Sequence, residues 1–322
     1  MRECDVTHEI RFIYDMNLKW ANAFPSEVKS VNLYVFDNDG LFVKEYSGNG
    51  KALSDPTYGI ILDLPTNQNY RFLAWCGLHN EGDTEESFIV PAPQVGVTNI
   101  EEMTAKLNCK VVDGNLVSDS QLQFLYHGYS EITLTDDYNN DAHHIYTIPL
   151  TKDTNHIRVM LQQVNGNLTP EDFEISLGAD NGELAWNNIP MENVEVVYNP
   201  WNIEADILGV GNSGENLTEY YGVIGDLSTS RLMADESTRI YLTVRNNEDG
   251  KLLFKVPMIQ YFLTEKSYYE QAYGHKMSNQ EFLDRQDEYF MTFFLDDQMQ
   301  WLYAVIDILE WRVVIRNYEI KD

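Results

Sequence analysis

The dominant pattern along the chain is an alternation of apolar and polar positions with a period of two. In "VKSVNLYVFD", Val31, Leu33 and Val35 fall on one face of an extended segment, and "TRIYLTVRN" repeats the alternation around Leu242. Successive side chains of a strand point to opposite faces of the sheet. This period therefore predicts half-buried antiparallel strands.

Further strands are predicted in segments with the same alternation or with a short apolar run, namely "YGIILDL", "YRFLAWC", "IYTIPL", "IRVMLQQ", "KLLFKVP" and "EWRVVIRNYEI". Asp39 and Gly40 in "FDNDGLFVKEY" tolerate positive φ, so this stretch is predicted to form a tight β-hairpin. Turn signals such as "NGN", "DNGE" and "GNSGEN" recur between the strands. The fold class is therefore predicted to be all-β, with mostly antiparallel β-sandwiches.

A chain of 322 residues is long for one hydrophobic core and suits two domains. "HEIRFIYD" near the start and "NHIRVMLQ" from residue 155 share an alternation around Ile-Arg, and we interpret each as the opening strand of a sandwich. Between them, "PLTKDTN" has little apolar content. We therefore place the boundary near residue 150, which gives an N-terminal β-sandwich at 1–150 and a C-terminal β-sandwich at 151–322.

The stretch "MSNQEFLDRQDEYFMTFFLDD", residues 277–297, predicts a short helix followed by a buried strand in the second domain. Ser278 and Glu281 have the spacing of a capping box at the start of a helix. The stripe expected to dock on the core consists of Phe282, Gln286 and Tyr289. Asp284 and Glu288 share another face, which we expect to point to water. Carboxylates on a wet helix face do not converge on one substrate atom, so the cluster predicts scaffolding and not acid/base catalysis.

Charge and hydropathy exclude some classes of function. With 51 acidic and 22 basic side chains, the net charge of -29 disfavours binding to nucleic acid or to anionic lipid. No run of about eighteen apolar residues occurs, so no segment of the sequence is predicted to span a bilayer by itself. The opening "MRECDVTHEIRF" has charge where a signal peptide would be apolar. Two interpretations follow: a cytosolic protein, or a trimmed form of an exported one.

Polar loop residues give one weak candidate for a metal site. The segment "DDYNNDAHH" clusters Asp136, Asp137, Asp141, His143 and His144. Their oxygens and imidazoles suit a cation, but the spacing is not diagnostic, and polar loops usually face water. We favour the solvated loop. Asp37 and Asp39 in "DNDG" lack the spacing of a calcium loop and are interpreted as turn residues.

No motif for a nucleophile elbow, a zinc protease, a phosphate loop or a dinucleotide site is present. Cys76 lies in an apolar strand, where burial raises the pKa of a thiol and makes a nucleophile improbable. The sequence therefore predicts no catalytic, cofactor-binding or metal-binding residue, and no enzyme. Trp186 and Trp201 either stack on sugar rings or pack under loops, and packing is the commoner fate of such residues.

Several segments together resemble the fimbrial anchor proteins of Bacteroidales, the FimB-like minor-fimbria anchor family. The resemblance covers nearly the whole chain and depends on the order of its segments, which are "IRFIYDMNLKWANAFPSEVKSVNLYVFDNDGLFV", "YRFLAWCGL", "LVSDSQLQFLYHG", "IRVMLQQ", "MSNQEFLDRQDEYFMTFFLDD" and "ILEWRVVIRNYEI". No single segment is as specific as a catalytic motif.

The resemblance implies two tandem transthyretin-like sandwiches, export through the periplasm, and a surface-exposed lipoprotein of the outer membrane that anchors or caps a fimbrium. Its partners would be fimbrial subunits, bound by β-strand complementation at a sheet edge. Residues 9–14 and 311–320 are the segments that we expect to fill or offer that edge. The alternative function is a sugar-binding surface module or a fimbrial tip adhesin on the same scaffold.

The cysteines depart from the family pattern. Cys4 follows Met-Arg-Glu and not a lipobox, so the lipid-bearing cysteine is expected upstream of Met1 and no residue of this sequence is assigned to it. Three cysteines, Cys4, Cys76 and Cys109, permit one disulfide and have no zinc spacing. The oxidising periplasm implied by the resemblance would favour that disulfide, and the pairing stays open.

Overall fold

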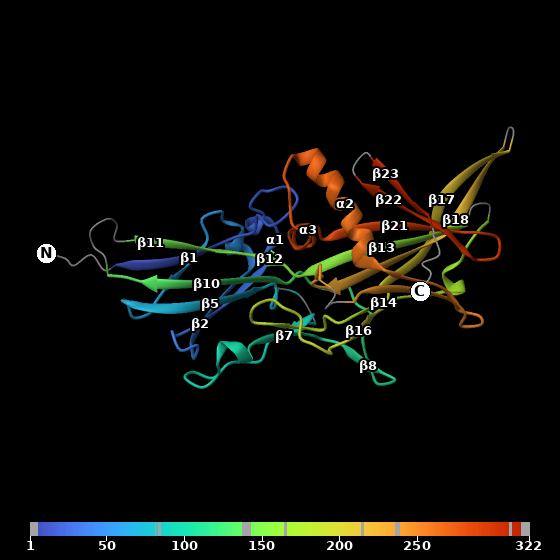
Figure 1. Cartoon of the computed structure of the whole chain (residues 1–322). Coiled ribbons are helices and arrows are strands. Elements are labelled where there is room, and N and C mark those ends of the chain that lie inside the picture. Colours follow the sequence, from blue (N-terminus) through green and yellow to red (C-terminus); the bar gives the residue numbers. More distant parts are fainter. Residues whose placement is uncertain are drawn as a thin grey trace. The chain divides into compact units, whose positions relative to one another are not determined.

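The computed structural model describes residues 6–80, 82, 85–136, 143–163, 166–213, 216–235, 239–308 and 311–316. Most of these residues lie in strands, which confirms the all-β prediction (Figure 1). The chain divides into two compact units. The first comprises Met1–Asn108, Gln123–Thr154 and Gly182–Met191, and the second comprises Cys109–Leu122, Asn155–Asn181 and Glu192–Asp322.

The first unit contains three sheets. One has the order β11 (His143–Pro149), β1 (Thr7–Ile13), β4 (Gly59–Leu62). The second has the order β12 (Thr151–Lys152), β10 (Tyr126–Leu134), β5 (Gln68–Cys76), β2 (Ser30–Phe36), β3 (Phe42–Asn49). The third has the order β15 (Glu183–Ala185), β7 (Thr104–Leu107), β6 (Phe88–Ile89). The short helix α1 (Phe24–Glu27) also belongs to this unit.

The core of the first unit lies between its first two sheets. Ile10 of β1 packs in one buried cluster with Leu33 of β2, Phe72 of β5 and Tyr126 of β10. The residues between β2 and β3 form the predicted hairpin, since these strands pair antiparallel and Gly40 has φ of 82°. Glycine adopts such a positive φ without steric cost, which suits it to this turn.

The second unit contains two six-stranded sheets. The first has the order β17 (Asn202–Ser213), β18 (Asn216–Ser230), β13 (Thr154–Gln163), β21 (Glu288–Leu295), β22 (Trp301–Ile308), β23 (Trp311–Arg316), and we call it the hairpin sheet. The second has the order β20 (Leu252–Pro257), β19 (Tyr241–Asn246), β14 (Phe173–Ala179), β16 (Val196–Tyr198), β9 (Asn115–Ser118), β8 (Lys110–Val112), and we call it the groove sheet.

The two sheets of the second unit enclose its core. The ring of Phe254 from the groove sheet stacks on Phe293 from the hairpin sheet, with ring centroids 4.9 Å apart. Alternate residues of β13 and β21 are fully buried, namely Ile157, Val159, Leu161, Tyr289, Met291, Phe293 and Leu295. Both units are thus β-sandwiches. A transthyretin-like topology for the two units stays a prediction.

Strand pairing is mostly antiparallel, but β1 and β13 are exceptions. β1 pairs parallel with β11, and β13 pairs parallel with β21. β9 and β16 form a third parallel pair. Parallel neighbours come from distant parts of the chain, because a crossover must connect them. The sequence pattern shows that a segment is a strand, but it does not give the direction of its neighbour.

Two α-helices lie in the described part of the second unit: α3 is the predicted short helix, whereas α2 was not predicted from the sequence. α2 spans Met258–Tyr273 and α3 spans Asn279–Arg285. The C-terminus of α2 is capped by Gly274 in the left-handed conformation, with φ of 72°. The ring of Phe262 on α2 stacks on Tyr289 of β21 at 3.9 Å between centroids, so α2 docks on the buried start of that strand.

The contiguous division at 1–150 and 151–322 differs from the compact units in two segments. Cys109–Leu122 belongs to the second unit although it precedes residue 150. Gly182–Met191 belongs to the first unit although it follows residue 150. The physical reason is strand pairing: β8 and β9 extend the groove sheet, and β15 pairs with β7. That two separately folding domains meet near residue 150 stays a prediction.

Candidate functional site

The hairpin sheet ends at β17 on one side and β23 on the other, in the part of the chain that the structure describes. β17 is the longer of the two edges, with 12 residues, and it forms an extended hairpin with β18 (Figure 1). An edge strand carries backbone donors and acceptors that face no neighbouring strand, and it is therefore a template for pairing with another chain.

The side chains of β17 alternate between an apolar and an acidic face. Ile203, Ala205 and Ile207 are two residues apart and lie on one face, whereas Glu204 and Asp206 lie on the other. Ile203 and Ile207 are each 39% exposed. Natural edge strands are usually protected by charge, by proline or by a covering segment. The face of β17 formed by Ile203, Ala205 and Ile207 carries neither a charged side chain nor a proline.

The exposed isoleucines belong to the face of the sheet that covers the core. Ala205 is paired with Val223 of β18, which is fully buried. Ile203 is paired with Gly225, where a Cβ atom would lie 3.4 Å from the core side chain of Ile175. The core-side face of the hairpin sheet therefore continues onto β17 but is not closed over there.

A β-bulge at Leu208 changes the register of the hairpin beyond Ile207. Val210 lies beyond the bulge, is paired with Glu219 of β18 and is 63% exposed. Tyr221, which is paired with Ile207, is also exposed. We use the name apolar edge strip for Ile203, Ile207, Val210 and Tyr221. Bulges are frequent at sheet edges, where they twist a strand and re-aim its side chains.

A buried carboxylate holds the start of β17 in place. Asp226 of β18 accepts hydrogen bonds from Arg158 Nε at 2.7 Å and from Asn202 Nδ2 at 3.2 Å, and His156 Nε2 lies 2.9 Å away. Burial would raise the pKa of Asp226, but the hydrogen bonds from Arg158, Asn202 and His156 outweigh it and lower that pKa. The cluster fixes the edge strand to the two strands beside it.

Sequence reasoning missed β17. The signal was present, because "NIEADI" alternates apolar and acidic residues with a strict period of two. The same segment is followed by the glycines of "GVGNSGEN", which were interpreted only as a turn. The exposure of its apolar face could not be predicted, since alternation alone does not distinguish a covered edge from an open one.

The two segments expected to form edges have different positions. Residues 9–14 were expected to fill or offer an edge. β1 is paired with β11 on one side and with β4 on the other, so it offers no open edge and instead fills a central position in its own sheet. The chain's own later strands occupy both sides. β23 is paired only with β22 among the described residues and is an edge strand, as expected. Residues 317–320 lie outside the described part.

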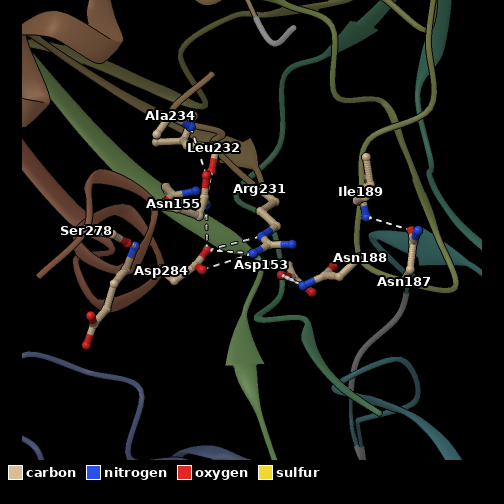
Figure 2. Close-up of polar contacts among 12 residues, drawn as sticks. Asp153, Asn155, Asn187, Asn188, Ile189, Arg231, Leu232, Ala234, Ser278 and Asp284 are labelled. Carbon is tan, nitrogen blue, oxygen red and sulfur yellow. Dashed lines mark hydrogen bonds and ion pairs between the residues drawn. The ribbon is translucent and has the colours of Figure 1, made fainter. Parts of the chain in front are cut away.

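The acidic helix is scaffolding, but its acids do not all face water. Asp284 forms a bidentate ion pair with Arg231, whose Nη2 lies 2.9 Å from Oδ1 and 3.0 Å from Oδ2 (Figure 2). The side chains of Arg231 and Asp284 are only 11% and 12% exposed. The expectation of a wet Asp284 is therefore wrong. The helical pattern could not show that the segment after β18 supplies an arginine.

The start of the helix is as predicted, but its end is earlier. Ser278 Oγ accepts a hydrogen bond from the backbone N–H of Glu281 at 3.0 Å. The carboxylate of Glu281 pairs with Arg285 at 3.0 Å, one turn further along. α3 ends at Arg285, so Glu288 is the exposed first residue of β21 and does not share a helix face with Asp284.

A second acid in this region is buried. Glu265 of α2 is 4% exposed, and its partner is Gln286, whose Nε2 lies 3.4 Å from Oε2. Burial raises the pKa of Glu265 to about 8 because no cation offsets the loss of hydration, and the hydrogen bond from Gln286 only reduces the effect. Glu265 was not singled out by sequence, since a lone Glu in a helix is usually exposed.

The residues of the weak metal candidate lie apart or bind elsewhere. Asp136 accepts a hydrogen bond from Asn67 at 2.8 Å, and His143 Nε2 lies 2.7 Å from Glu9 Oε2. His144 stacks on His8 with centroids 5.2 Å apart. Asp137 and Asp141 lie outside the described residues. Over the described part of the chain, no three His, Cys, Asp or Glu side chains gather in a group that could hold a metal ion.

The remaining sequence candidates are packing residues. Cys76 is fully buried in β5, and burial raises its pKa well above the ordinary value of a thiol. Trp186 packs edge-on against Tyr129 at 5.2 Å, and Trp201 lies 6.0 Å from His156, between ring centroids. Both tryptophans are half-buried, so packing is their observed role. Cys4 lies outside the described residues. The described helices are all too short or too polar to cross a bilayer.

An open sheet edge is a surface on which another chain can add a strand. The chain belongs to the family of fimbrillin-A associated anchor proteins Mfa1 and Mfa2, whose model matches residues 1–317. Family membership confirms the resemblance found in the sequence. It is a family of structural fimbrial proteins. No curated protein matches the chain.

Solved structures share the fold over nearly the whole chain. A candidate adhesin from Bacteroides thetaiotaomicron is 32% identical, with a TM-score of 0.82 over 97% of this chain and 99% of that one. A candidate polysaccharide-binding protein from the same species is 26% identical, with a TM-score of 0.76 over 98% and 99%. The fimbrial anchor protein Mfa2 from Porphyromonas gingivalis is 16% identical, with a TM-score of 0.66 over 97% and 99%.

The ion pair of α3 makes a prediction about stability. Asp284→Ala removes the carboxylate that accepts from the buried guanidinium of Arg231, so we expect the free energy of unfolding to fall by about 3 kcal/mol. Glu288→Ala, which removes an exposed acid four residues further along the chain, should change the free energy of unfolding by less than about 0.5 kcal/mol. Denaturant unfolding of both variants measures the difference. Equal effects would show that Asp284 is a surface residue.

Glu265 makes a prediction about pH. Its pKa is about 8 when folded, against an ordinary value of 4.5, so the folded state binds more protons between these values. Stability from this group is therefore complete below the ordinary value and is lost as pH rises toward the folded value. We expect Glu265→Gln to lose less thermal stability than the natural protein between about pH 5 and about pH 8. If the melting temperatures of Glu265→Gln and of the natural protein changed with pH by the same amount, the raised pKa of Glu265 would be contradicted.

Proposed function

We propose that this protein is a fimbrial anchor or accessory subunit at the cell surface, and that it binds a pilin by β-strand complementation at the edge of β17. One observation supports the site: the core-side face of the hairpin sheet carries exposed isoleucines, Ile203 and Ile207, on a long edge strand. Anchor function is drawn from the family to which the chain belongs.

A strand donated by a pilin satisfies two needs of this edge together. Its backbone forms hydrogen bonds with the outward N–H and C=O groups of β17, which supply affinity. Its alternate side chains cover the apolar edge strip, which supplies specificity and removes apolar area from water. The acids Glu204 and Asp206 lie on the opposite face and stay hydrated. An extended segment with alternating apolar residues is therefore the partner of matching chemistry.

β23 is a second edge of the same sheet and is the position expected from the sequence. Its residues Trp311–Arg316 pair with β22 on one side. Half as many residues are described there as in β17, and Val314 is an exposed apolar side chain. We place pilin binding at β17 because the apolar edge strip is longer and continues the core-side face. Loss of β23 would then leave pilin binding in place.

The membrane link is the second part of the proposal. We infer from the family that the mature protein is a lipoprotein of the outer membrane that faces the cell surface. Growth of the native host with a labelled fatty acid, followed by isolation of the protein, is expected to show label in this chain. Protease treatment of whole cells should then remove it. A protein without label would contradict the lipid anchor and leave the pilin site untouched.

A substitution on the apolar edge strip tests the pilin site. Ile207→Lys places a charge where a donated strand would pack, and we expect the dissociation constant for a purified fimbrial subunit from the same gene neighbourhood to rise at least about tenfold. Glu204→Lys on the acidic face of the same strand is the control, and it should bind within about twofold of the natural protein. It changes net charge more than Ile207→Lys does, so simple electrostatics would affect it first.

Surface-immobilised subunit and purified variants give these constants directly. Circular dichroism must show that both variants keep the strand content of the natural protein. Equal binding by Ile207→Lys and the natural protein would exclude the β17 edge. If deletion of residues 311–322 abolished binding in that case, β23 would be the pilin edge instead.

A further inference from the structure

The solvent face of the groove sheet is hollowed into a polar groove of about 570 Å3. It lies wholly in the second unit and is formed by outward residues of β8, β9, β14, β16, β19 and β20. A volume of this size is in the range of small-ligand sites. Trp186 and Trp201 do not line it. The groove and the apolar edge strip share no residue, so a ligand in the groove is independent of the proposed fimbrial function.

Small residues form the floor of the groove. Gly178 of β14 is paired with Tyr241 of β19 on one side and with Val197 of β16 on the other. Ser176 and Thr243 are paired beside them. A Cβ atom at Gly178 would have only Glu195 Oε1 nearby, at 3.8 Å. The missing side chain thus leaves open space at the centre of a sheet face.

Charged groups of both signs line the groove. The acids come from the turn between β8 and β9, from β14 and from the segments next to β14 and β16, and they are Asp113, Glu174, Asp180 and Glu195. The bases lie on the side of β19 and β20 and are Arg239, Arg245 and Lys255. Three cations at one groove are a local excess in a chain with 22 basic and 51 acidic residues. The two signs nearly balance within the groove.

Most of these polar groups are not used by the fold. Lys255 Nζ lies 4.6 Å from the centroid of the Tyr241 ring, and Arg245 Nη1 donates to the carbonyl of Gly250 at 3.1 Å. The carboxylates of Glu174, Asp180 and Glu195 have no hydrogen bond or ion pair with any described residue. Seven charged side chains, four acids and three bases, therefore line one hollow, and most of them have hydrogen-bonding capacity to spare.

We propose that this groove binds an uncharged glycan segment. Sugar hydroxyls both donate and accept hydrogen bonds, so they match a wall of carboxylates facing a wall of guanidinium and ammonium groups. Tyr241 lines the same groove, and the Lys255 ammonium lies over its ring. A polyanion is disfavoured by the acids, and a polycation by the bases. Strand addition is excluded in the middle of the sheet, where the ladder already uses the backbone groups.

The glycine floor provides the test. Gly178→Phe fills the hollow from a strand position whose φ is ordinary, so the sheet is expected to fold. The probes are dextran, yeast mannan and soluble starch as neutral polysaccharides, with heparin as the polyanion. Affinity electrophoresis should retard the natural protein in at least one neutral gel. Gly178→Phe should weaken that binding at least about tenfold, whereas Gly178→Ala should stay within about twofold.

Three readouts decide the proposal. Melting temperatures show whether Gly178→Phe and Gly178→Ala are both folded. Tyr241→Ala tests the same surface without added bulk, and Tyr273→Ala, at an exposed tyrosine of α2 outside the groove, is its control. Binding of heparin alone, binding of no neutral polysaccharide, or equal retardation of Gly178→Phe and the natural protein would overturn the assignment. Pilin binding by Gly178→Phe should be unchanged, so failure at the groove and failure at the β17 edge are separate results.

Discussion

The parallel pairing of β1 with β11 and of β13 with β21 is the constraint on which both sandwiches depend. β1 lies between β11 and β4, and β13 lies between β18 and β21, so neither strand has an edge of its own. The buried residues of β13, among them Val159 and Leu161, contact a core that is complete only when β21 is in place. Parallel neighbours far apart in the sequence make formation of these sheets a long-range event.

That constraint also decides where the hairpin sheet is open. With β13 and β21 at its centre, the remaining strands extend outward to β17 and β23. Asp226 then joins β18 to Arg158 of β13 and to Asn202 of β17, so the start of the edge strand is fixed to its neighbours on one side. A segment that is already fixed loses little conformational entropy when another strand is added, which favours association.

Much of the fold could be predicted from the sequence, because the period of two is a direct consequence of strand geometry. The alternation around Leu242 and the turn at Gly40 identify strands and a hairpin that the structure contains. Pairing across long distances was beyond the pattern, as the central position of β1 shows. The prediction that Asp284 faces water was wrong for a related reason. A helical pattern assigns a residue to a face of the helix, but only the tertiary fold brings Arg231 against that face. The groove around Gly178 depends on six strands together and has no local signal.

The two proposed surfaces of the second unit use different parts of the chain's chemistry. An edge strand binds through its backbone, so its partner is any extended segment with suitable alternate side chains, and sequence change at β17 alters specificity before it abolishes pairing. A groove on a sheet face binds through side chains alone, because its backbone groups are already paired. A groove can therefore change ligand with a few substitutions while the edge keeps its partner. Separation of the surfaces onto two sheets allows one unit to attach to a fibre and to contact a glycan at the same time.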